Sequence, residues 1–118
     1  MPPQLSIRID FDGEGRLGPG KVLLLERIAQ EGSISAAGRS MKMSYRRAWE
    51  LVADINASFA EPLVASQAGG KSGGGAILTE RGRELVSHYR AIERKALSAV
   101  ARHLEALQAI SRTKRSKR

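Results

Sequence analysis

The chain has 118 residues, enough for one hydrophobic core and too few for a second. It carries 20 Lys and Arg against 12 Asp and Glu, and the resulting formal charge of +8 favours a polyanionic partner, with nucleic acid ahead of an anionic membrane surface. The absence of cysteine excludes disulfides and thiolate chemistry, and no segment is apolar enough to span a bilayer or to serve as a signal peptide. We therefore expect a soluble, cytoplasmic, single-core protein with no membrane partner.

The first part of the chain predicts a strand and then a helix. Apolar and polar residues alternate over 5–11, the period of a half-buried strand, before Asp12-Gly13 opens a glycine-rich loop. Pro19 suits the first turn of a helix, and apolar residues recur at helical spacing until Gly32 supplies a stop.

The next segment predicts two helices separated by a tight turn. Ser35 is the expected N-cap of a short helix that ends near Ser40, and Ser44 can cap a longer one. The apolar residues of the longer helix lie on one side of a helical wheel: Ala48, Leu51, Val52, Ile55 and Phe59.

The outward side of this longer helix is basic. Arg46 points away from the apolar side, with Arg47 and Trp49 on the two flanks. Arginine can bind guanine in bidentate fashion, while serine and tyrosine hydroxyls can hold phosphates, although exposed arginines can also do no more than solvate a helix face. For Trp49, a place in the core is favoured over a contact with the DNA backbone.

After Pro62, two short strands at 63–67 and 76–79 flank a glycine-rich loop and predict a hairpin. Gly70-Lys71-Ser72 lacks the first glycine of a nucleotide-binding loop, since Ala65 stands at that place, and the loop joins strand to strand. Two alternatives remain, a flexible hairpin without function and a wing whose lysine and glycine amides contact DNA phosphates. The preceding helix, turn and helix favour the wing.

From Glu80 onward, the sequence predicts one helix that extends on the order of 45 Å and outruns its own domain. Its apolar residues step by three or four, which favours pairing with a second chain. The residues expected at that interface are Leu85, Tyr89, Ile92, Ala96, Val100, Leu104 and Leu107. His88 and His103 lie on the same helix without an acidic cluster or a nucleophile, so we expect no enzyme, no metal site and no cofactor.

Two stretches resemble the N-terminal DNA-binding domain of the ModE family of molybdate-responsive regulators, which lies near the LysR-type winged helices. They are GSISAAGRSMKMSYRRAW at 32–49 and GGKSGGGAILTERG at 69–82, within a similarity that runs from Gly20 to about Arg94. The resemblance implies a mainly α winged helix-turn-helix with a small antiparallel sheet over 1–79 and a dimerisation helix over 80–111. Residues 112–118 are mostly Lys and Arg, and this composition predicts a basic, disordered tail.

The resemblance also implies a homodimeric, sequence-specific transcription factor that binds a double-stranded DNA operator, with genes of molybdenum uptake or metabolism as targets. The candidate DNA-contacting residues are Ser33, Ser35, Lys42, Ser44, Tyr45, Arg46, Arg47, Gly70, Lys71, Ser72 and Gly73. The oxyanion-binding module of full-length members is not in this sequence, so molybdate sensing is not carried over. The alternatives are an architectural DNA-binding protein without sequence preference and a DNA-binding subunit recruited by a separate sensor protein.

Overall fold

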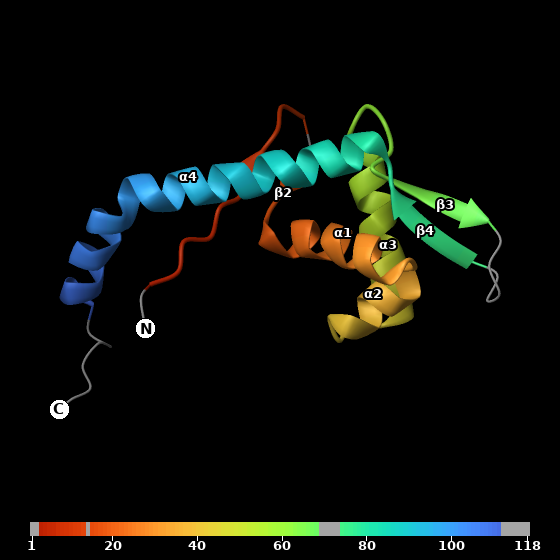
Figure 1. Ribbon diagram of the computed structural model, residues 1–118, viewed down its shortest axis with the longest axis horizontal. Coiled ribbons are helices and arrows are strands. Elements are labelled where there is room, and N and C mark those ends of the chain that lie inside the picture. The colour runs from red at the N-terminus through yellow and green to blue at the C-terminus, as the bar shows by residue number, and fades with distance from the viewer. Residues whose placement is uncertain (1–2, 14, 69–73, 112–118) are drawn as a thin grey trace.

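The computed structural model describes residues 3–13, 15–68 and 74–111, and Figure 1 shows a small helical domain from which one long helix projects. The elements in chain order are β1 (Ile9–Asp10), β2 (Arg16–Leu17), α1 (Pro19–Glu31), α2 (Ile34–Ser40), α3 (Tyr45–Ala57), β3 (Val64–Ala68), β4 (Gly74–Leu78) and α4 (Glu80–Ile110). The expected fold class, mainly α with small antiparallel sheets and a long C-terminal helix, is confirmed. Within the described ranges, no helix has both the length and the apolar character needed to cross a bilayer.

The strand predicted over 5–11 forms only in part. Ile9 and Asp10 pair antiparallel with Leu17 and Arg16, in a second strand that the sequence did not predict. The residues before Ile9 have no partner strand, and the carbonyl of Ile7 instead accepts a 2.6 Å hydrogen bond from the Tyr89 hydroxyl. The N-terminal segment is therefore attached to α4 rather than extended into a longer sheet.

The main core lies where α1, α2, α3 and the β3–β4 hairpin meet. Leu24, Leu25 and Ile28 of α1 are completely buried there, together with Ala48 and Ile55 of α3. A smaller cluster packs Leu17 and Val22 against Tyr89 of α4. The apolar face expected for α3 is thus the face that packs into the core. On α1, Val22, Leu25 and Ile28 are buried as the helical spacing predicts, but Ala29 at the same spacing is exposed and Leu24 is buried instead.

Helix ends follow from local hydrogen bonds. Gly32 ends α1 with a left-handed conformation (φ 79°), as expected for a glycine stop, and Ser44 caps α3 by accepting from the Arg47 amide at 3.0 Å. The expected cap of α2 was wrong by two positions: Ser33, not Ser35, has the extended backbone and accepts from the Ala36 amide at 3.0 Å. Because α1 ends at Gly32, the chain can turn directly into α2.

The long helix α4 is held to the domain through its first half. The guanidinium of Arg90 makes two hydrogen bonds to Glu26 of α1, at 2.6 and 2.9 Å, and a third to Glu93 at 2.6 Å. Arg90 lowers the pKa of Glu26 below its ordinary value, chiefly through this hydrogen bonding, while partial burial opposes the shift. The second half of α4 extends past the domain in Figure 1.

The start of α4 approaches β3 so closely that only glycine fits at position 82. A Cβ built on Gly82 would lie 2.3 Å from the Leu63 carbonyl oxygen, which already accepts a hydrogen bond from the Thr79 amide. By contrast, a Cβ on Gly20 in α1 would meet no atom within 4 Å.

We expect Gly82→Ala to lower the free energy of unfolding by about 1–3 kcal/mol, because backbone must move to admit the methyl group. Gly20→Ala, the matched control, should raise it by about 0.5–1 kcal/mol through its helix propensity. Urea unfolding followed by circular dichroism measures both. Equal effects of the two substitutions would contradict the close α4–β3 contact.

We expect Glu26→Gln to cost about 1 kcal/mol of stability near neutral pH, since it removes a charge-assisted pair that is about one-third exposed. Because the folded-state pKa of Glu26 is lowered, the stabilisation is fully present above the ordinary value of 4.5 and is lost as the pH falls through the folded value. The difference between the two proteins should therefore shrink in acid. Glu61→Gln, at a more exposed 3.6 Å pair with Arg81, should change stability little at any pH.

Candidate nucleic-acid interface

The turn between α2 and α3 sets the two helices close together. Met41 and Met43 both donate backbone hydrogen bonds to the Gly38 carbonyl, each at 3.0 Å. A Cβ on Gly38 would lie 2.8 Å from the Ala48 Cβ, so the two helices touch at a glycine and an alanine. Between the methionines, Lys42 adopts a left-handed conformation with φ 59°, which sends the chain sharply into α3.

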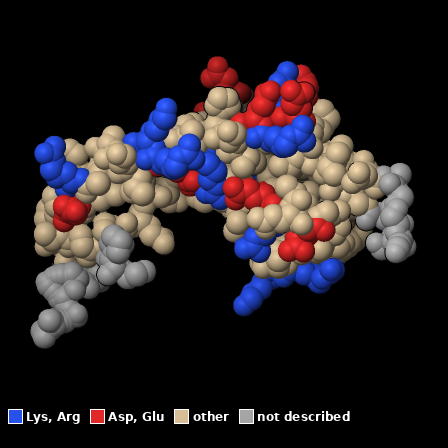
Figure 2. Space-filling model, viewed as in Figure 1, with Lys and Arg blue, Asp and Glu red and all other residues tan. Residues whose placement is uncertain are grey.

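The outward face of α3 is basic and aromatic. Arg46 and Arg47 are exposed, and the Arg46 side chain is 85% accessible even with Glu50 3.6 Å away. Tyr45, at the first position of α3, is 65% exposed. In Figure 2, basic side chains gather at the lower edge of the domain, where Figure 1 places α2 and α3.

The preference for Trp49 in the core was wrong. Its side chain is 44% exposed, and its ring lies 6.1 Å from that of Tyr45, centroid to centroid. The core partners of α3 contact the side that carries Ala48, Val52 and Ile55, and Trp49 is not among the residues that form or pack against the core. A helical wheel places a flank residue but does not say whether a neighbour covers it.

The polar residues near α2 that were expected to contact DNA differ in their exposure and in their local role. The Ser33 hydroxyl is engaged in capping α2, and Ser35 is half-buried in the first turn of that helix. Lys42 is exposed in the turn between α2 and α3, and Ser44 is exposed at the start of α3. The structure thus brings Lys42 and Ser44 together with Tyr45, Arg46 and Arg47 at one end of α3.

The hairpin β3–β4 is antiparallel, with Gln67 opposite Gly75 next to its tip. The candidate wing residues Gly70, Lys71, Ser72 and Gly73 lie outside the described residues. The middle of β4 is tied to the C-terminal end of α1, because the Ala76 amide donates to the Gly32 carbonyl at 2.9 Å.

Asn56, near the end of α3, ties the hairpin to that helix. Its side-chain oxygen accepts from the backbone amides of Leu63 and Val64 at 2.9 and 3.1 Å, and its amide group donates to the Val64 carbonyl at 3.1 Å. Sequence reasoning missed this residue, because nothing in the pattern distinguishes it from an exposed polar residue. Asn56 fixes where β3 starts relative to α3.

The residues expected at an interface along α4 differ in exposure. Tyr89 is buried in its own chain, and Leu85, Ala96, Val100 and Leu104 are half-buried. Ile92 and Leu107 are exposed at 43% and 61%. Sequence reasoning left out two other large exposed apolar residues of α4, Leu97 and Ile110.

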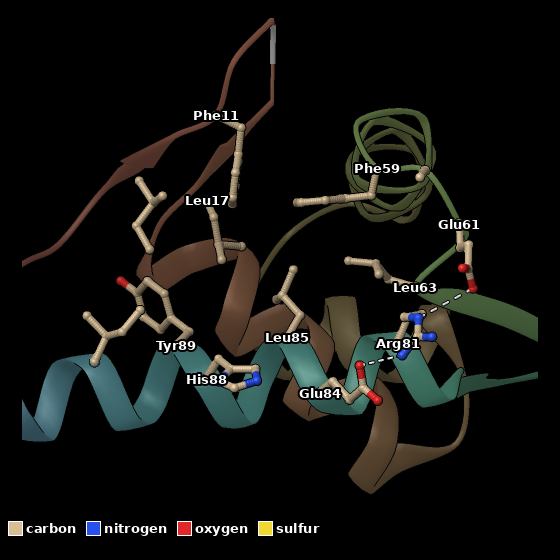
Figure 3. A pocket seen from close by; sticks show the side chains of 13 residues that line it. Phe11, Leu17, Phe59, Glu61, Leu63, Arg81, Glu84, Leu85, His88 and Tyr89 are labelled. Carbon is tan, nitrogen blue, oxygen red and sulfur yellow. Dashed lines mark hydrogen bonds and ion pairs between the residues drawn. The ribbon is translucent and has the colours of Figure 1, made fainter.

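An open apolar cavity of about 510 Å³ lies between β1–β2, the end of α3 and the first half of α4 (Figure 3). The rings of Phe11 and Phe59 meet edge to face across it, 5.3 Å apart. Arg81, paired with Glu61 and Glu84, borders one side. The cavity lies on the α4 side of the domain and not at the turn between α2 and α3.

These elements define a class. A three-helix core whose second and third helices cross at a tight turn, followed by an antiparallel hairpin, is a winged helix-turn-helix. The exposed basic face lies on α3, which is the second helix of the helix-turn-helix formed by α2 and α3. In proteins of this class, that helix enters the DNA major groove.

Comparison with known proteins identifies the family, although no protein-family model matches the chain. The chain is 40% identical over 103 residues to the molybdenum transport protein ModE of Azotobacter vinelandii, covering 87% of this chain and 38% of that protein. It is 47% identical over 78 residues to the molybdenum-pterin-binding protein MopB of Rhodobacter capsulatus, covering 66% and 29%. It is 39% identical over 71 residues to the DNA-binding transcriptional dual regulator ModE of Escherichia coli K12, covering 60% and 27%.

The chain belongs to the ModE family, as a counterpart of the N-terminal region of those proteins. The family resemblance seen in the sequence is thereby confirmed. The chain spans between 27% and 38% of the length of these relatives. None of the three relatives carries the name of an enzyme.

Because the backbone at Lys42 is left-handed, we expect that replacing this residue by glycine stabilises the protein. Lys42→Gly should raise the free energy of unfolding by up to about 1 kcal/mol, because glycine adopts φ near 59° without a Cβ clash. Lys42→Ala removes the same charge but keeps the strain, so it should bring no such gain. Urea unfolding of the two variants measures the difference, and equal stabilities would contradict the strained turn.

Proposed function

We propose that this chain is a DNA-binding unit of a homodimeric, sequence-specific transcriptional regulator that acts in the cytoplasm on genes of molybdenum uptake or metabolism. The observation that carries the proposal is the exposed face of α3, where Arg46, Arg47 and Tyr45 stand outward from a helix-turn-helix. The charge of +8 supports a polyanionic partner. The names of the relatives support both the DNA partner and the link to molybdenum.

We assign the base contacts to Arg46 and Arg47. Both lie in the first turn of α3, the part of a recognition helix that is nearest to base edges. Among the described residues, the Arg46 guanidinium pairs only with Glu50, at 3.6 Å, so it can exchange that exposed partner for guanine at little cost.

We assign phosphate contacts to the residues around this face. Lys42 and the Ser44 hydroxyl are exposed next to the first turn of α3, and the N-terminus of α2 at Ser33 and Ser35 offers backbone amides. The wing, with Gly70, Lys71, Ser72 and Gly73, completes the set. Phosphate contacts orient a protein on DNA and contribute equally on every sequence.

We further propose that two copies pair along α4. The exposed apolar residues Ile92, Leu97, Leu107 and Ile110 lie on a helix of 31 residues, far longer than its own domain covers. Half-buried Ala96, Val100 and Leu104 extend this surface. Two recognition helices would then address half-sites about 34 Å apart or a multiple of that spacing. We assign DNA binding and pairing to these residues, and no role in effector binding.

The test begins with DNA fragments selected from a random pool by the protein itself. A sequence-specific regulator should bind the selected fragments about 10³-fold or more tightly than random DNA, with an affinity that falls steeply as salt rises. Arg46→Ala should cost about 1–3 kcal/mol of that discrimination, the worth of one bidentate base contact. Arg8→Ala, at another exposed arginine that lies on the N-terminal segment, should leave the discrimination unchanged.

Two outcomes would overturn parts of the proposal. Equal affinity for selected and random DNA would leave an architectural DNA-binding protein without sequence preference. Light scattering that gives the mass of one chain at micromolar concentration would exclude the homodimer, and a mass that grows only when cell extract is added would indicate a separate sensor protein as the partner.

A further inference from the structure

Tyr45 and Trp49 form an exposed aromatic pair on the outward face of α3. They stand one helical turn apart, are 65% and 44% exposed, and have ring centroids 6.1 Å from one another. Neither side chain belongs to the hydrophobic clusters that build the core. Burial of these two rings against a binding partner would be energetically favourable, because neither ring is buried within the domain itself.

The pair has no polar role within the described chain either. No hydrogen bond joins the Tyr45 hydroxyl or the Trp49 indole N–H to any other described residue, and the two rings contact each other at a tilt of 58°. Arg46 and Arg47, their neighbours on α3, also project into solvent. The aromatic pair is therefore accessible to a negatively charged ligand, which Arg46 and Arg47 would attract.

The major groove of DNA offers apolar surface at one chemical group. Base pairs present hydrogen-bond donors and acceptors there, and the C5-methyl group of thymine is the apolar feature that distinguishes one base from the others. An aromatic side chain on a recognition helix can bury that methyl, whereas an arginine next to it binds guanine.

Resting on the proposed function, we propose that Tyr45 and Trp49 are specificity-determining residues that contact thymine C5-methyl groups in the major groove. Residues four apart on a helix are separated by about 6 Å along its axis, while successive base pairs are about 3.4 Å apart. One helix can thus bring the two rings to methyl groups within two base steps. The aromatic pair selects thymine beside the positions where Arg46 and Arg47 select guanine.

The test replaces thymine by uracil, which lacks only the methyl group. A fragment selected from random DNA by the wild-type protein is amplified once with dTTP and once with dUTP, and binding of both products is measured by titration at one salt concentration. The wild-type protein should bind the dUTP product about fourfold more weakly for every thymine methyl group that the aromatic pair buries, the factor that matches burial of one methyl group. In a dimer, the buried methyl groups of both half-sites contribute, and their individual factors are multiplied to give the total loss of affinity.

Variants separate this contact from a change in DNA shape. The double variant Tyr45→Ala, Trp49→Ala should bind both products alike, because the groups that contact the methyls are gone. Arg46→Ala is the matched control and should keep the full sensitivity to uracil although its overall affinity falls. Tyr45→Phe should also keep it, since the ring and not the hydroxyl contacts the methyl. Both aromatic residues are exposed, so thermal unfolding should show that the variants fold.

The outcomes are distinguishable from those that test the proposed function. If the wild-type protein selects no DNA, the regulator proposal fails. If it selects DNA but binds the thymine and uracil products equally, the methyl contact is overturned while the regulator stands. Sensitivity to uracil that persists in the double alanine variant would also overturn it, and would assign the effect to DNA shape.

Discussion

The close contact between α2 and α3 at Gly38 and Ala48 is the constraint on which the exposed surface depends. Because no side chain separates the helices there, their crossing is set by backbone and one methyl group. The Gly38 carbonyl holds both ends of the intervening turn, and Lys42 accepts a left-handed conformation within it. The cost is local strain at Lys42, and the result is an α3 whose basic and aromatic residues are exposed on its outward face.

The hairpin is positioned by its buried apolar residues and by polar contacts with its neighbours. Asn56 binds the backbone of Leu63 and Val64, and Gly32 binds the amide of Ala76, so β3 and β4 are attached to α3 and α1 respectively. These bonds satisfy backbone groups of a short, two-stranded sheet that would be marginal alone. They also fix the hairpin relative to the helix that carries Arg46, an arrangement that fits the proposed contact of both elements with one DNA duplex.

The long helix α4 serves two purposes in one continuous element. Its first half completes the core through Tyr89 and binds α1 through the Arg90–Glu26 pair, while its second half carries exposed apolar residues beyond the domain. The apolar residues therefore form one continuous stripe along α4 in the sequence, although the first of them pack inside the domain and the later ones are exposed. A helix that buries part of its stripe internally offers only the remainder to a second chain, and the proposed pairing rests on that remainder.

The sequence by itself determined the order of the main elements, the caps at Ser44 and Gly32, the apolar face of α3 and most of that of α1, and the family, because each depends on neighbours within a few residues or on a contiguous motif. The tertiary structure decided the burial of Tyr89, the exposure of Trp49 and the role of Asn56. It also decided that Ser33 and not Ser35 caps α2, and that the backbone of Ile7 bonds to Tyr89 of α4 and not to another strand. Each of these depends on which distant segment packs against a given side chain, and helical or strand periodicity specifies a direction from the backbone without specifying what lies in that direction.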